Sequence, residues 1–301
     1  MAVPPAVPWD LGDRTISVRR LPAPGRPTLV MVHGLGGSSL NWVALMRELE
    51  GEFDLVALDL PGFGASPPPR DGRYSPAGHG RAVVALINAL DDNGIDRSGP
   101  VHLMGNSLGG AVSVQVAGRR PDLIASLSLI SPAMPHGRVG RGNVHLPVVA
   151  IPGVGDALVK RYAQVPAEVR MQSTVDACFA EPGRLDDDVR SALLDEVLAR
   201  DALTYSRDAF LSSLRGLMGS FFGAGPRRPW RLAAAYPGPV LALYGEDDIL
   251  VDARGASRAA RYFADPEVVL IPDCGHVAQM EHPDLVADLF RSRVSRGKTD
   301  S

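Results

Sequence analysis

Short, continuously apolar segments recur along this chain, and most are followed by a segment whose apolar residues have helical spacing. The apolar segments are 28–32, 53–58, 101–104, 125–130, 240–244 and 268–271. Continuous runs, in contrast to alternating ones, predict strands that are covered on both faces. The helical patterns are 41–49, 77–90, 108–119, 252–263 and 283–293. This order predicts an α/β fold with a doubly wound, mostly parallel sheet, preceded by an antiparallel pair around residues 15–19.

The alternation stops for roughly 100 residues, which is too long for an ordinary connection between two elements. The intervening stretch is mostly helical in pattern, and its clearest helix is expected at 184–200, where apolar residues form one stripe. We therefore expect a core of residues 1–132 and 230–301, with residues 133–229 inserted as a helical cap.

Charge and cysteine content exclude several classes of partner. The chain has 31 basic and 34 acidic residues, a net charge of −3 and no long run of like charges, which disfavours nucleic acid and membrane surfaces as partners. Its two cysteines, Cys178 and Cys274, lack the spacing of a disulfide framework or a zinc site, and no other metal-ligand motif occurs. A cytoplasmic location, with neither metal nor cofactor, is the simplest expectation.

The sequence Gly-Asn-Ser-Leu-Gly joins a predicted strand to a predicted helix and carries Ser107 at its centre. A turn this tight strains the serine and lifts its hydroxyl clear of the sheet, while the glycines remove side chains that would collide. The backbone N–H of Leu108, at the start of the helix, then points at whatever Ser107 attacks.

A second glycine-rich loop, His-Gly-Leu-Gly-Gly, follows the strand at 28–32. It completes neither a P-loop nor a dinucleotide fingerprint, so phosphate binding is the weaker interpretation. The stronger one is that the N–H of Leu35 is a second donor to an oxyanion. His33 is then structural, and it supports the loop together with Gly34, Gly36 and Asn106.

Acidic residues and a histidine follow the last two predicted strands. Gly-Glu-Asp-Asp comes after 240–244, and Asp-Cys-Gly-His comes after 268–271. Because parallel strands end at the same edge of the sheet, Ser107, an acid near residue 248 and His276 can converge. Nucleophile, acid and base then occur in that order along the chain.

These motifs, with Asp-Leu-Pro-Gly-Phe-Gly-Ala-Ser after the second strand, resemble the α/β-hydrolase fold enzymes over about residues 15–132 and 230–293. The resemblance implies a triad of Ser107, Asp248 and His276. In the family's G-x-x-D pattern the acid is the fourth residue, which falls on Asp248.

The resemblance implies a carboxylesterase-like serine hydrolase that acts on a small apolar ester through an acyl-enzyme on Ser107. A serine at this position excludes the haloalkane dehalogenases and epoxide hydrolases, which use an aspartate. The main alternative is carbon–carbon bond hydrolysis of a vinylogous diketone, whose carboxylate Arg161, Arg170 or Arg190 of the cap could bind. Those enzymes resemble His-Gly-x-Gly-Pro-Gly in the oxyanion loop, whereas this chain has no proline there. A small-ligand receptor on the same fold is the alternative of another class.

Three further polar residues are assigned structural roles from the sequence. Glu281 and His282, at the start of the last helical pattern, are expected to be capping and surface groups. His102, inside a predicted buried strand, is expected to be a hydrogen-bonded core histidine.

Overall fold

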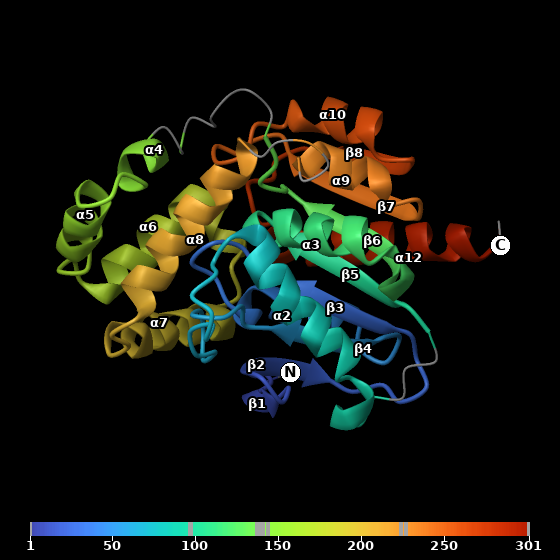
Figure 1. The fold of residues 1–301 in the computed structure, drawn as a ribbon, viewed down its shortest axis with the longest axis horizontal. Helices are drawn as coiled ribbons and strands as arrows, with labels where there is room; N and C mark the ends of the chain where they lie inside the picture. Colours follow the sequence, from blue (N-terminus) through green and yellow to red (C-terminus); the bar gives the residue numbers. More distant parts are fainter. Residues whose placement is uncertain are drawn as a thin grey trace.

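The protein is built around one sheet of 8 strands in the order β1-β2-β4-β3-β5-β6-β7-β8 (Figure 1). A computed structural model describes residues 2–95, 99–135, 142, 145–222, 225 and 228–299. The strands are β1 Ala6–Asp10, β2 Thr15–Leu21, β3 Thr28–Val32, β4 Asp54–Leu58, β5 Val101–Asn106, β6 Ile124–Ile130, β7 Pro239–Gly245 and β8 Asp265–Ile271.

The pairing of the strands confirms the predicted sheet. Every neighbouring pair from β4 to β8 is parallel, and the hairpin of β1 and β2 is joined antiparallel to β4. The central strands β3, β4 and β5 are buried at every position, as their unbroken apolar sequences predict.

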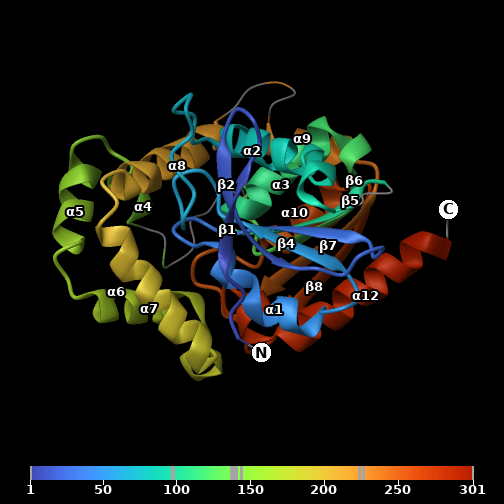
Figure 2. The same cartoon turned by 90° about the horizontal axis from the view of Figure 1, so that it is seen from below.

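Helices cover both faces of this sheet, as a doubly wound fold requires (Figure 2). Helices α2, α3, α9 and α10 share one apolar core with one face, and α1 and α12 share another with the opposite face. Their bounds are α1 Val43–Glu48, α2 Pro76–Asn88, α3 Leu108–Arg119, α9 Pro229–Ala235, α10 Gly255–Tyr262 and α12 Pro283–Thr299. None of the helices in the described part of the chain is long and apolar enough to cross a bilayer.

Helix boundaries differ from the sequence prediction by a few residues, and two of these differences come with specific contacts. The helix expected at 41–49 starts with a 3₁₀ turn, Ser39–Trp42, because the Ser38 hydroxyl accepts from the Leu40 N–H and the Asn41 side chain accepts from the Ser38 N–H. The helix expected to end at residue 293 continues to Thr299, beyond its apolar stripe. An ion pair between Arg296 and Glu267 of β8 accompanies this extension.

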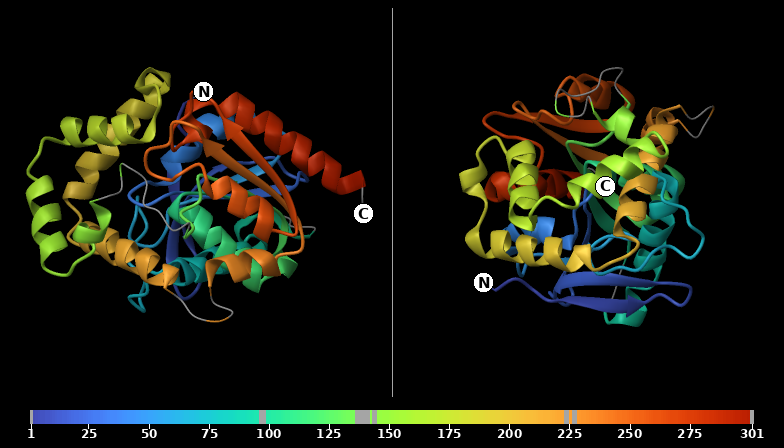
Figure 3. Two further views of the ribbon diagram at one scale, coloured as in Figure 1. Left: turned by 90° about the horizontal axis from the view of Figure 1, so that it is seen from above. Right: turned by 90° about the vertical axis from the view of Figure 1, so that its left-hand side faces the viewer.

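The inserted region is helical and lies beside the carboxyl ends of the parallel strands (Figures 1 and 3). It contains α4 Leu146–Val149, α5 Val154–Tyr162, α6 Ala167–Cys178, α7 Asp187–Asp201 and α8 Ser206–Phe221. Helix α7 matches the expected helix, although it begins three residues later than 184. We refer to α4–α8 as the cap; its limits at residues 133 and 229 stay a prediction.

Candidate active site

Ser107 occupies a strained turn between β5 and α3. Its backbone has φ 53° and ψ −117°, a conformation that costs a non-glycine residue about 1–3 kcal/mol and persists only where neighbours impose it. Those neighbours are specific: Ser107 N–H donates to Ile130 O at 3.0 Å, and Ser107 O accepts from Ala133 N–H at 2.9 Å. Gly109 is required here because a Cβ would lie 2.0 Å from Val32 O.

His276 and Asp248 form a buried pair at the ends of β8 and β7. The Nδ1 atom of His276 lies 2.8 Å from Oδ2 of Asp248, and the two side chains are 6% and 1% exposed. The other carboxylate oxygen accepts from the N–H groups of Leu250 and Val251 at 2.8 and 2.9 Å. Burial raises the pKa of Asp248, but the His276 ring and the Val251 N–H lower it by more, so the pKa lies below its ordinary value.

Asp248 is therefore an ionised acceptor for His276 Nδ1–H. This fixes the tautomer in which Nε2 keeps its lone pair. Neighbouring Glu246 and Asp247 are exposed, so the geometry supports Asp248 as the acid.

The backbone of His276 is held from two sides. Its carbonyl accepts from Asn106 Nδ2 at 2.9 Å, and the same amide group donates to Ile130 O at 3.1 Å. Its N–H donates to Cys178 O, at the end of α6, at 2.6 Å. Asn106, beside Ser107 in the chain, thus connects the turn at Ser107 to the loop of His276. The second connection to the backbone of His276 comes from Cys178 of the cap.

The loop of residues 33–37 after β3, here called the glycine loop, lies against Ser107. A Cβ on Gly34 would be 3.1 Å from both Ser107 Cβ and Asn106 Oδ1. His33 Nε2 accepts from Leu60 N–H at 2.9 Å, so its Nδ1 carries the proton and donates to Gly34 O at 2.7 Å. Burial lowers the pKa of His33 to about 4, which keeps the ring neutral and suits a supporting role.

Two backbone N–H groups near Ser107, those of Leu108 and Leu35, are candidate donors to a substrate oxygen. Leu108 is the first residue of α3, so its N–H has no partner inside the helix. The Leu35 N–H donates to none of the residues that the structure describes. Leu35 lies between Gly34, which contacts Ser107, and Gly36, which has φ +77°. The arrangement can stabilise negative charge that develops on an atom bonded to Ser107.

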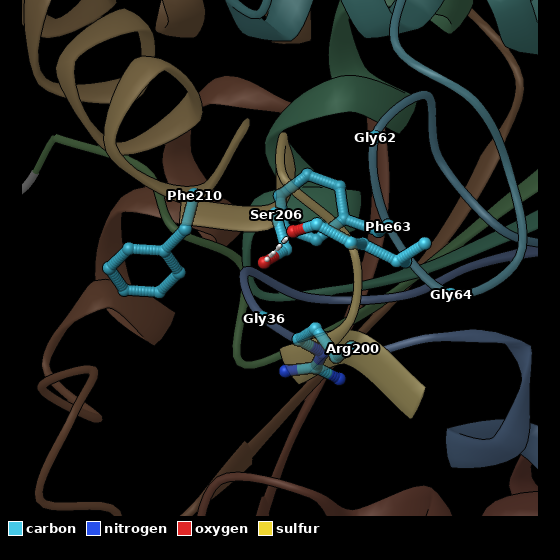
Figure 4. Close-up of a pocket in the computed structure, with 8 residues that line it drawn as sticks. Gly36, Gly62, Phe63, Gly64, Arg200, Ser206 and Phe210 are labelled. Atoms are coloured by element: carbon cyan, nitrogen blue, oxygen red, sulfur yellow. Dashed lines mark hydrogen bonds between the residues drawn. The ribbon is translucent and has the colours of Figure 1, made fainter. Parts of the chain in front are cut away.

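The cap arginines considered from the sequence have other partners or positions. Arg170 binds Asp201 and Val165 O, Arg190 binds Gln172 and Pro182 O, and Arg161 is exposed. Arg200, which the sequence does not single out, pairs with Glu196 at 2.7 Å and lines a cavity of about 20 Å³ between cap and core (Figure 4).

That cavity is lined by Gly36 of the glycine loop, by Phe210 of α8 and by Arg200. Its volume is about that of one water molecule. No sequence pattern sets Arg200 apart, because only the docking of the cap brings it to the glycine loop.

The structural assignments of the remaining polar residues are partly wrong. His102 is a buried histidine that pairs with Ser126 Oγ at 2.7 Å, as predicted. Glu281 is not a surface group, because its side chain is 0% exposed and bonded to two backbone N–H groups. His282 Nε2 lies 2.7 Å from Arg184 Nη1 of the inserted helical region. His282 therefore contacts a distant part of the chain and does more than cap its own helix.

Neither cysteine is suited to nucleophilic or metal chemistry. Burial raises the pKa of Cys178 and of Cys274 to about 12, so both remain protonated thiols at neutral pH. Within the described part of the chain, no three His, Cys, Asp or Glu side chains are grouped as a metal site would need.

Comparison with known proteins agrees with this architecture. The family model for the alpha/beta hydrolase fold matches residues 27–283. The chain therefore belongs to the α/β-hydrolase fold family.

Individual relatives have differing activities. A 2-hydroxy-6-oxononadienedioate/2-hydroxy-6-oxononatrienedioate hydrolase of Paraburkholderia xenovorans is 30% identical over 266 residues, 86% of this chain and 84% of that protein. The dihydrolipoyllysine-residue acetyltransferase component of the acetoin cleaving system of Pseudomonas putida is 30% identical over 282 residues, 92% of this chain. The chain spans only 66% of that relative's length.

Among solved structures, a thermophilic esterase from Thermogutta terrifontis superposes with a TM-score of 0.72. The two are 22% identical, and the match covers 97% of this chain and 98% of the esterase. At this level of identity the likeness concerns the fold.

Proposed function

We propose that this α/β hydrolase cleaves carboxylic esters through an acyl-enzyme on Ser107. The observation that carries the proposal is the strained Ser107, tied through Asn106 to a His276 whose Nδ1 lies 2.8 Å from buried Asp248. Strain at a partly buried serine and a histidine in a fixed tautomer together fit acyl transfer.

In this mechanism His276 Nε2 takes the hydroxyl proton as Ser107 Oγ attacks the ester carbonyl. The resulting oxyanion accepts hydrogen bonds from the N–H groups of Leu35 and Leu108, each contributing about 3 kcal/mol to stabilisation of the transition state. Collapse of the tetrahedral intermediate breaks the ester C–O bond, and His276 returns the proton to the departing alcohol. Water, activated by the same nitrogen, then attacks the acyl-enzyme and releases the acid.

The close meeting of cap and glycine loop supports a preference for short acyl groups. The cavity that Gly36, Arg200 and Phe210 line has a volume of about 20 Å³. Long acyl chains would require the cap to move away from the core.

Carbon–carbon bond hydrolysis is the second candidate, and it uses the same nucleophile, acid and base. Two observations favour it: the name of the Paraburkholderia xenovorans relative, and the Arg200 guanidinium beside the glycine loop. The guanidinium pairs with Glu196 at 2.7 Å, and its other N–H donors suit a substrate that carries a carboxylate. The missing proline in the glycine loop favours the ester.

One panel of assays separates these functions. p-Nitrophenyl esters of increasing chain length and a coloured vinylogous diketone are tested on the wild-type protein and on Ser107→Ala. Rapid cleavage of short esters, lost in Ser107→Ala, is expected. Cleavage of the diketone alone would support the second candidate.

Tight binding with less than about one turnover per minute would instead indicate a receptor. Ester cleavage that survives in Ser107→Ala contradicts the proposed mechanism.

A further inference from the structure

Glu281 is a buried carboxylate that the mechanism above does not use. It lies at the end of α11 (Ala278–Glu281), and its side chain is 0% exposed. Burying a charged carboxylate is unfavourable unless hydrogen bonds replace its water. Two backbone groups do so: Glu181 N–H donates to Oε1 at 2.7 Å, and Gly275 N–H donates to Oε2 at 2.8 Å.

The two oxygens of Glu281 hold two different parts of the protein. Gly275 directly precedes His276, whereas Glu181 lies 100 residues away along the chain, in the cap between α6 and α7. One rigid carboxylate therefore spans the boundary between the cap and the loop of the histidine. We call residues 178–184 of the cap the latch segment.

Other contacts fasten the latch segment to the same loop. Arg184 Nη1 donates to Asp273 O at 2.7 Å and lies 3.7 Å from Glu281 Oε1. The Cys178 carbonyl accepts from His276 N–H at 2.6 Å. At Gly275 the packing is backbone against backbone, because a Cβ there would lie 2.4 Å from Cys178 O.

The position of the catalytic imidazole thus depends on the cap. Three polar groups of His276 are fixed: Nδ1 by Asp248, the carbonyl by Asn106, and the N–H by Cys178 of the latch segment. Asp248 and Asn106 belong to the core, so the N–H bond is the contribution of the cap. Glu281 keeps that bond aligned by holding Gly275 and the latch segment in register.

Resting on the proposed serine hydrolase function, we propose that Glu281 is a positioning residue that couples docking of the cap to placement of His276. The cap in this arrangement does more than enclose substrate, since its latch segment completes the support of the base. A displacement of about 1 Å at a catalytic group can reduce a rate by about 100-fold. Loss of Glu281 is therefore expected to lower kcat far more than it changes KM.

The test compares Glu281→Gln with Glu281→Ala. Glutamine keeps the shape but has a single carbonyl oxygen, so its NH₂ group opposes one of the two N–H donors. We expect kcat for a short p-nitrophenyl ester to fall by about 10- to 100-fold, with KM within about threefold of wild type. Inactivation of Ser107 by an organophosphonate, which also needs the base, is expected to slow by the same factor.

A matched control separates positioning from simple stabilisation. Glu267→Gln also removes a glutamate from an ion pair, here the one with Arg296. It should leave kcat, KM and the rate of inactivation by the phosphonate unchanged. Active-site titration measures the fraction of competent molecules, so incomplete folding of Glu281→Ala is corrected for. The Tm of Glu281→Gln reports the structural effect separately.

Two results would overturn the inference. One is a kcat for Glu281→Gln within twofold of wild type; the other is a loss of activity that the titrated fraction explains entirely. Either result leaves the proposed function intact as long as the phosphonate labels Ser107 of the wild-type protein. Absence of that label would contradict the proposed function itself.

Discussion

In the core, strands β3, β4 and β5 are buried at every position, whereas in the cap helix α5 buries only Gly155. Valine and leucine side chains of α5 that would be internal in the core are in solvent: Val154 and Leu158 are each 44% exposed. Ser107 and Asp248 thus follow strands that are almost entirely buried, β5 and β7, whereas α5 at the edge of the cap contributes little to the packing.

The cap touches the core through α6 and α7 on one side and through α8 on the other. Met171 and Val175 of α6 and Val189 of α7 pack with Leu40 and Val43 of the core in a single apolar cluster. The segment that binds the histidine loop lies between α6 and α7. Helices α4 and α5 are at the opposite, exposed end.

The largest expected effect tests the core side of this contrast. Asp248→Asn should reduce kcat by about 10⁴-fold, because an amide stabilises the wrong tautomer of His276. Asp247→Asn is the matched control, since Asp247 is exposed and adjacent in the chain. Steady-state kinetics on a short ester measure both, and comparable losses in the two variants would contradict the assignment of the acid.

A pair of glycine substitutions tests the difference in packing. Gly109→Ala should lower the free energy of unfolding by about 3 kcal/mol, because its Cβ would lie 2.0 Å from Val32 O. Gly219→Ala, in the cap helix α8, meets nothing within 4 Å and should raise it by about 0.5–1 kcal/mol. Urea denaturation measures both changes; a stabilising Gly109→Ala would mean that the turn between β5 and α3 is packed more loosely than described.

The boundary between core and cap is expected to be sensitive to acid. His79 of α2 lies 2.9 Å from Ser213 Oγ of α8, and burial lowers the pKa of His79 to about 3, with a contribution from His33. The unfolded chain takes up the proton near pH 6.5, so stability is full above that pH. It is lost as pH falls toward 3, by about 1.4 kcal/mol per pH unit for this histidine.

Unfolding curves measured between pH 7 and 4 check this dependence. His79→Asn should show a shallower slope than wild type, because the buried titrating ring is gone. His145→Gln removes an exposed histidine of the cap and should keep the slope of the wild-type protein. Equal slopes for wild type and His79→Asn would disprove the role of His79.

The smallest expected effect concerns substrate choice by the cap. Arg200→Ala should raise KM about tenfold for a diketone that carries a carboxylate, and change KM for neutral esters by less than twofold. Arg161→Ala is the control, because Arg161 is exposed on α5 and lines no part of the cavity. An equal change in KM for both substrates would show that Arg200 does not bind the substrate carboxylate.

Local patterns were sufficient to predict the core but not the contacts of the cap. The strained serine was predictable because a strand, Gly-Asn-Ser-Leu-Gly and a helix follow one another, and the parallel strands dictate which edge receives His276. The burial of Glu281 could not be predicted from the sequence, because Glu181, which covers one of its oxygens, is 100 residues away along the chain. Arg200 pairs locally with Glu196, one helical turn earlier, and only the docking of the cap brings it beside the glycine loop.

The strained backbone conformation of Ser107 exists only in the folded protein, so enzymatic activity indicates that the chain is folded. The conformation persists because Ile130 O and Ala133 N–H hold it, and these groups reach Ser107 only once β6 has paired with β5. An unfolded or half-made chain contains the serine but no activated nucleophile. Any turnover recovered after refolding therefore counts native molecules.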